Sequence, residues 1–136
     1  MKRLLQILFA VFALVSTAGA APSQVGVSTS LQATAGNGER KSFYDELNRA
    51  HWAFYYDGSA IAYSYSVDGS TWTSAGTLPY NTSAFTVTQK VLSGQSYVFV
   101  AVESNYDVLL LRGVLGASSI SFAAPVTAFD GRGAAD

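Results

Sequence analysis

Residues 51–73 read HWAFYYDGSAIAYSYSVDGSTWT, and this stretch decides how the rest of the chain is interpreted. Two runs rich in aromatic and other strand-favouring residues flank Asp57-Gly58, a dipeptide typical of a two-residue hairpin turn. A second Asp-Gly pair follows the second run and requires another turn there, because glycine supplies the backbone freedom that a tight turn needs. The stretch therefore predicts three antiparallel strands, the third of which starts near Thr71.

Alternation along these strands assigns their side chains to two faces. One face collects large side chains, which are Trp52, Phe54, Tyr56, Ile61, Tyr63 and Tyr65. The opposite face carries Tyr55 and small residues, which are Ala53, Ala60, Ala62, Ser64 and Ser66. Neither face contains Lys, Arg or Glu, whereas a sheet with one wet face shows charge at every second position. We therefore expect a sheet that is covered on both faces by stacked neighbours.

The second turn of this stretch contains a motif. The run Ser66-x-Asp68-Gly69-x-x-Trp72 resembles an Asp-box, the hairpin motif of BNR-repeat, sialidase-like β-propellers, and is one residue shorter than the form S-x-D-x-G-x-T-W. In such a turn the Asp carboxylate accepts backbone N–H bonds and the Trp ring packs the turn onto the sheet. The run from Trp52 to the first Asp-Gly is similar to the second strand of those blades. The alternative is an ordinary hairpin in an all-β secreted domain.

The first 20 residues have the three parts of a secretory signal peptide. Met1-Lys2-Arg3 is basic, residues 4–15 are apolar apart from Gln6, and residues 18–20 form an Ala-x-Ala site. We expect cleavage before residue 21 and secretion to an extracellular or periplasmic location. A membrane anchor is disfavoured because about a dozen apolar residues are too few to span a bilayer. No cysteine is present to carry a lipid, so we expect no membrane contact after cleavage.

Charge and length bound the mature chain. Of eight basic residues, six remain without Lys2 and Arg3, against nine acidic ones, which gives a net charge of −3. That balance argues against nucleic acid or an anionic membrane as a partner. Without cysteine the exported chain must be stabilised by packing alone. Its 116 residues are too few for a closed propeller, which needs at least four blades of about 40–50 residues.

The mature chain divides into two loosely similar halves. Residues 40–83 are expected to form a first blade with the Asp-box, and residues 84–136 a second, degenerate blade with the start of a further strand. Trp52 aligns with Val98 at an offset of 46 residues, and Trp72 with Phe122 at 50, a period that suits one blade. Further strands are expected at residues 40–44, 85–88, 97–102, 106–114 and 119–122, with a loop or one helical turn at 45–48.

Two segments stay open to more than one interpretation. Residues 21–39 are small and polar, and they are either a linker or an edge strand that closes a blade. Residues 124–131 either begin a third blade or finish the second. The fold class that the pattern favours is all-β, with antiparallel four-stranded sheets as the blades of an incomplete propeller.

No catalytic residue, metal ligand or cofactor site is expected. A sialidase requires three arginines, a Tyr–Glu nucleophile pair and an acid/base Asp, and no arginine motif of that family occurs here. His51 is the only histidine and no cysteine is present, so a zinc site is not expected. Glu103 and Asp107 could serve glycoside hydrolysis only if their carboxyl groups were suitably spaced, and nothing in the sequence fixes that spacing.

Tyr55, Tyr56, Tyr80 and Tyr106 are the candidates for stacking on sugar rings. The alternative is that they belong to the core, because aromatic residues at a period of two in strands usually do.

The leading hypothesis is a secreted, non-catalytic segment of a sialidase-like β-propeller that binds carbohydrate or another extracellular partner. One alternative is the N-terminal part of a sialidase or other glycoside hydrolase whose catalytic residues lie beyond residue 136. The other is a small β-sandwich adhesion module. Because both faces of the first sheet lack charge, the chain is also expected to self-associate or to pack against further blades.

Overall fold

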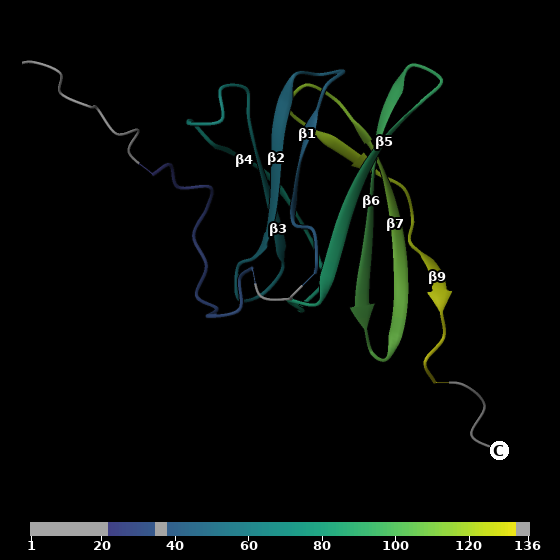
Figure 1. The fold of residues 1–136 in the computed structure, drawn as a ribbon. Coiled ribbons are helices and arrows are strands. Elements are labelled where there is room, and N and C mark those ends of the chain that lie inside the picture. The colour runs from purple at the N-terminus through teal and green to yellow at the C-terminus, as the bar shows by residue number, and fades with distance from the viewer. Residues whose placement is uncertain (1–21, 35–37, 133–136) are drawn as a thin grey trace, which may run out of the picture.

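A computed structural model gives the structure of the protein and describes residues 22–34 and 38–132. The predicted signal peptide lies outside the described residues. Nine strands form two antiparallel sheets, and the described residues contain no helix (Figure 1). None of the described segments is therefore a helix long and apolar enough to cross a membrane.

The prediction of an all-β chain with two antiparallel sheets is confirmed. The first sheet has the order β1-β2-β3-β4, and its strands are β1 Ser42–Asp45, β2 Ala50–Tyr56, β3 Ile61–Ser66 and β4 Thr73–Leu78. The second sheet has the order β5-β6-β7-β8, with β9 also pairing to β7, and its strands are β5 Phe85–Leu92, β6 Gln95–Ser104, β7 Asp107–Leu115, β8 Ile120–Phe122 and β9 Val126–Phe129. Neither sheet closes on itself.

The register of the first sheet places side chains as the alternation predicted. Trp52 lies opposite Tyr65 and Phe54 opposite Tyr63, so the large residues share one face. The first turn is longer than expected, because four residues rather than two separate β2 from β3. The Asp57 carboxylate holds this wider loop by accepting bonds from the N–H groups of Ser59 and Ala60, both at 2.8 Å.

The two hairpins of the second sheet were not predicted. Each is closed by a two-residue turn with positive φ at both positions, Ser93-Gly94 at 50° and 78° and Asn105-Tyr106 at 53° and 72°. Such turns match the natural twist of the strands they join. Tyr106, expected to begin a strand, therefore lies in the second turn, and its side chain is exposed. Because both hairpins are tight, β5 and β6 extend further than expected.

β8 and β9 together form one interrupted edge strand. β8 pairs with the end of β7, β9 pairs with its beginning, and the chain between them contains Pro125. Proline is tolerated at a sheet edge, where its missing N–H is not needed. β9 thus finishes the second sheet, which is one of the two outcomes left open. Phe122 is not equivalent to Trp72, because its ring meets Tyr63 of the facing sheet at 5.9 Å.

The core lies between the two sheets, which face each other in Figure 1. The large residues that alternate along β2 and β3 form one core cluster with residues of β5, β6 and β7. The largest fully buried apolar side chains are Trp52, Phe54, Ile61, Leu115, Val87, Val98, Val100 and Val102. Each such side chain contributes about 1.5–3 kcal/mol by leaving water. Tyr63 is also buried, and this burial raises the pKa of its hydroxyl. One face of each sheet is therefore buried against the other sheet.

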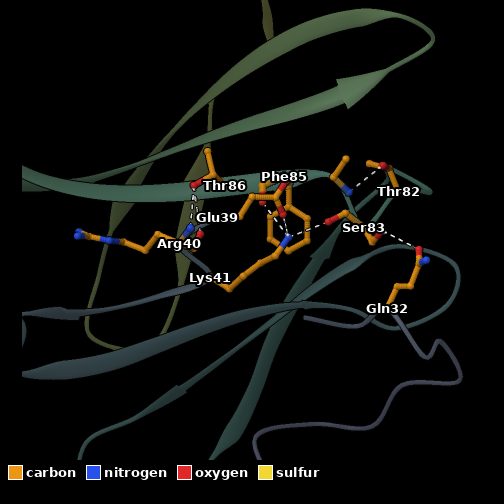
Figure 2. A network of polar contacts seen from close by, with 9 residues as sticks. Gln32, Glu39, Arg40, Lys41, Thr82, Ser83, Phe85 and Thr86 are labelled. Atoms are coloured by element: carbon orange, nitrogen blue, oxygen red, sulfur yellow. Dashed lines mark hydrogen bonds and ion pairs between the residues drawn. The ribbon is translucent and has the colours of Figure 1, made fainter. Parts of the chain in front are cut away.

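Arg40 and Lys41 join the two sheets at their first strands (Figure 2). The Arg40 carbonyl accepts a bond from Val87 N–H of β5, and the Lys41 carbonyl accepts one from Phe54 N–H of β2, both at 2.8 Å. The Lys41 ammonium turns inward, donates to the carbonyls of Ser83 at 2.7 Å and Phe85 at 2.8 Å, and lies 3.4 Å from the Phe85 ring centre. Its ion pair with Glu39 measures 2.8 Å, so the charge is fully compensated.

A buried polar cluster crosses the far end of the core. Asp45, expected in a polar loop, is fully buried and accepts bonds from Ser96 Oγ at 2.8 Å and Asn48 Nδ2 at 2.6 Å. Ser96 in turn accepts a bond from Gln89 Nε2 at 2.8 Å. Ser64 is equally buried, yet its Oγ has no hydrogen-bond partner among the described residues. The two buried serines therefore make a matched pair, one satisfied and one not.

We predict opposite effects when each serine is replaced by alanine. Ser96→Ala should lower the free energy of unfolding by about 1–3 kcal/mol, because it removes one bond to the buried Asp45 carboxylate and the acceptor of Gln89 Nε2. Ser64→Ala should leave stability unchanged or raise it by up to about 1 kcal/mol, since no bond is lost. Urea unfolding of both variants measures the difference. Equal losses in the two variants would contradict the arrangement described.

Candidate binding cleft

The outer face of the first sheet is built from residues that alternate with the core. From β2 it receives His51, Ala53 and Tyr55, and from β1 Ser42 and Tyr44, with Tyr44 directly opposite His51. β3 adds only small residues there, because Ala62, Ser64 and Ser66 lie opposite Tyr55, Ala53 and His51. These small β3 residues are almost completely buried, whereas Tyr44 of β1 is 45% exposed. The accessible part of this face therefore lies over β1 and β2.

Residues 22–34 lie against this face without forming a strand. The segment is anchored at one end where Thr29 N–H donates to the Asp57 carbonyl at 2.9 Å and Ser28 Oγ donates to the Tyr56 carbonyl at 2.6 Å. Near its other end Trp72 Nε1 donates to Ser23 Oγ at 3.3 Å. An edge strand was one of the two interpretations left open, and the described residues 22–34 and 38–39 contain no strand. Residues 22–34 instead cover part of the sheet from one end to the other.

Both anchor points are Asp-Gly-Ser turns of similar construction. In the second turn Asp68 Oδ1 accepts bonds from Thr71 N–H at 2.7 Å, Ser70 N–H at 2.8 Å and Ser66 Oγ at 2.9 Å. The two backbone N–H bonds are those that the sequence predicted, the bond from Ser66 Oγ was not predicted, and together they lower the pKa of the Asp68 carboxyl. Gly69 adopts a φ of 72°, which favours glycine. Because these bonds occupy Ser70 and Thr71, β4 begins at Thr73 rather than near Thr71.

The first turn repeats this chemistry at the opposite end of β3. Bonds from the N–H groups of Ala60 and Ser59 and from the Ser59 hydroxyl lower the pKa of Asp57. The shared Asp-Gly-Ser sequence is a signal that could have revealed the pair of anchors. Nothing in the sequence indicated that residues 22–34 extend from one of these turns to the other.

A cleft of about 640 Å³ opens between residues 22–34 and the outer face of the first sheet. Its lining includes seven aromatic residues. Trp52, Phe54 and Phe43 also belong to the core or pack against it, and the other four are Tyr44, His51, Tyr55 and Trp72. The Tyr44 and His51 rings lie 4.7 Å apart, and Tyr44 is 45% exposed. Gly26 abuts the Tyr55 ring, where a Cβ atom would come within 2.6 Å of three ring and hydroxyl atoms. The volume is in the range of small-molecule and short-oligomer sites.

The cleft has little charge of its own. Its lining among the described residues contains no carboxylate. Lys41 belongs to the lining, but its ammonium is occupied by Glu39 and by two carbonyls on the core side. His51 is the other residue of the lining with an ionisable nitrogen, and Ser28, Ser42 and Thr34 contribute hydroxyl groups to the lining. The cleft therefore suits a neutral ligand with apolar faces and hydroxyl groups.

The four predicted stacking residues do not form one site. Tyr55 lines the cleft, whereas the Tyr56 hydroxyl bonds to Asn81 Oδ1. Tyr80 lines a second, polar hollow of about 460 Å³ between the ends of the two sheets. Tyr106 is 78% exposed at a hairpin tip. Sequence reasoning missed the pair that joins Tyr55 in the cleft, Tyr44 and His51, although strand alternation places both on its face.

The carboxylates considered for hydrolysis are not a pair. Glu103 is exposed on the outer face of the second sheet, while Asp107 is on the inner face and pairs with Arg132 at 2.6 Å. The Arg132 guanidinium holds the pKa of Asp107 below its usual value. Within the described ranges no three His, Cys, Asp or Glu residues come close enough to hold a metal ion.

Comparison with known proteins gives no further guide to the cleft. No family model, no curated protein and no solved structure matches the chain. Its chemistry has to be argued from the residues that line it.

We predict that acid weakens the anchors of residues 22–34. Because the pKa values of Asp57 and Asp68 are lowered in the folded protein, their stabilising effect is complete above the usual aspartate pKa and is lost as the pH falls below about 4. The melting temperature should therefore fall between pH 5 and pH 2, and protonation of Asp57 and Asp68 should account for part of this fall. An Asp57→Asn, Asp68→Asn double variant should show a smaller drop, and an unchanged drop would refute the role of the two carboxylates in holding the turns on which residues 22–34 are anchored.

Proposed function

We propose that the chain is an exported, non-catalytic carbohydrate-binding protein whose ligand lies in the cleft on the first sheet. One observation carries this proposal: an open cleft whose lining, within the described part of the chain, combines aromatic residues with hydroxyl groups, contains no carboxylate, and includes Lys41 only with its ammonium paired to Glu39. Sugar rings present apolar C–H faces that lie on aromatic rings, and their hydroxyls bond to short polar side chains. A neutral saccharide fits this lining better than an acidic one.

The arrangement of strands supports a relationship to sialidase-like propellers, and we propose that the two sheets are consecutive blades. Each sheet is a meander of strands in sequence order, and the Asp68 turn lies between the third and fourth strands of its sheet. The two first strands meet at Arg40 and Lys41, as the inner strands of neighbouring blades would. The resemblance of the Asp-box supports the same relationship.

The alternative of a small β-sandwich adhesion module is favoured by a different observation. The two sheets share one continuous core, and residues 22–34 cover part of the outer face of the first sheet. Either architecture leaves the cleft in place, so the binding proposal does not depend on the choice between them.

The alternative of a sialidase or other glycoside hydrolase gains little support from the described residues. Arg40 lies at the sheet junction, Arg49 in the turn before β2, Arg112 on the outer face of the second sheet, and Arg132 against Asp107. Four arginines spread in this way make no common grip for a substrate carboxylate. Any hydrolytic role belongs to the longer protein that this hypothesis assumes.

We predict that the protein binds neutral oligosaccharides and that two rings of the cleft are required. A glycan array with neutral and sialylated members identifies the ligand, and calorimetry measures its affinity. Tyr55→Ala and Trp72→Ala should each weaken binding about tenfold, the effect of losing one stacking partner. Tyr106→Ala, which removes an exposed ring far from the cleft, serves as the matched control and should bind as the natural protein does.

Two outcomes would contradict this proposal. One is an array without any bound neutral glycan; the other is binding that survives loss of both cleft rings. Turnover of a fluorogenic sialoside by the purified chain would instead support the hydrolase alternative.

We also predict that the exported protein begins at Ala21, as the signal pattern indicates. Mass spectrometry of the N-terminus of protein recovered from the periplasm or medium measures this directly. A protein that retains Met1 would show that residues 1–20 are not removed.

A further inference from the structure

The second sheet has an outer face on which no other described segment packs (Figure 1). Cross-strand pairing arranges this face in rows. One row contains Ala101 beside Leu110, which is paired with Val126, and the next contains Thr88 beside Phe99 and Arg112. Outside these lie a row with Tyr97 and Val114 and a row with Val108 and Phe129. Apolar side chains thus dominate the face over β6, β7 and β9, whereas β5 adds Thr86, Thr88 and Lys90 at the edge.

The exposure of these side chains is high for residues of their kind. Leu110 is 38% exposed, Val114 39%, Phe129 62% and Val126 66%. Soluble monomers rarely carry contiguous apolar patches of more than a few hundred Å², and larger ones mark interaction sites. Most apolar residues on the inner face of the same sheet are buried against the first sheet, and Val91, which is 45% exposed near the β5–β6 turn, is an exception.

Charges are placed at the two ends of the face with opposite sign. Glu103 lies in the row of Val108 and Phe129 at one end, while Lys90 lies in the row of Tyr97 and Val114 at the other. Arg112, in the neighbouring row, adds to the positive end and lies 5.7 Å from the Tyr97 ring centre. The face therefore has an apolar middle, a negative end and a positive end.

We propose that this face binds a second copy of the chain in a two-fold dimer. A two-fold axis that runs across the strands lays the face on its own copy with the strand directions reversed. The Glu103 end of each copy then lies over the Lys90 and Arg112 end of the other, and the apolar rows meet in the middle. An axis along the strands would bring like charges together, so the charge pattern selects the first arrangement.

The dimer is tested by sedimentation equilibrium of the mature protein over a range of concentrations. The natural chain should sediment as a dimer that dissociates on dilution. Leu110→Asp should yield a monomer, and Glu103→Lys should weaken association about tenfold through like-charge contact. Val67→Asp is the matched control, because Val67 is 70% exposed on the β3–β4 turn, away from this face, and it should not change association.

A charge swap makes the test specific for the proposed arrangement. Glu103→Lys combined with Lys90→Glu and Arg112→Glu restores opposite charges at the two ends and should recover the dimer that Glu103→Lys weakens. Circular dichroism and melting confirm that each variant is folded. A natural chain that is monomeric at every concentration overturns the proposal, as does a dimer unaffected by Leu110→Asp or a triple variant as weak as Glu103→Lys.

Discussion

The burial of one face of each sheet against the other is the constraint on which the remaining structure depends. Trp52, Phe54 and Tyr63 meet valines and leucines of the second sheet, and no disulfide assists them because the chain has no cysteine. Lys41 reinforces this contact at its edge, since its ammonium is held by two carbonyls of the chain leading into the second sheet, the Glu39 carboxylate and the Phe85 ring. Because these faces are buried against each other, a ligand or partner can reach only the outer faces, the edges and the ends of the sheets.

The two outer faces have different characters, and both follow from strand alternation. On the first sheet, the small outward residues of β3 are buried, while the outward residues of β1 and β2 line a cleft beside residues 22–34. On the second sheet, branched and aromatic residues fill the outward positions almost evenly. The first suits a small ligand in a cleft, and the second suits a broad, flat partner.

Sequence reasoning succeeded where the information was local. The alternation in residues 52–66 placed each side chain on its correct face. The backbone bonds to Asp68 could be predicted because they join residues within one turn. Sequence reasoning failed where a residue depends on a distant partner. Asp45 was predicted in a polar loop, but it is buried in the core, where it accepts a bond from Ser96, 51 residues away in sequence. The cleft likewise needs residues 22–34 to reach both turns, which no local pattern foretells.

The order of strands in each sheet also determines how the chain can fold. Within each meander every strand up to the fourth pairs with the strand before it, so the hairpins close short loops and need no distant contact to form. The meeting of the two sheets comes at greater sequence separation, and residues 22–34 have only a few hydrogen bonds to the finished sheet. We expect this segment to be the last part to attach and the first to open, as hydrogen exchange would reveal. One wall of the cleft would then be the least stable part of the folded chain, and a ligand that holds the wall closed would stabilise it directly.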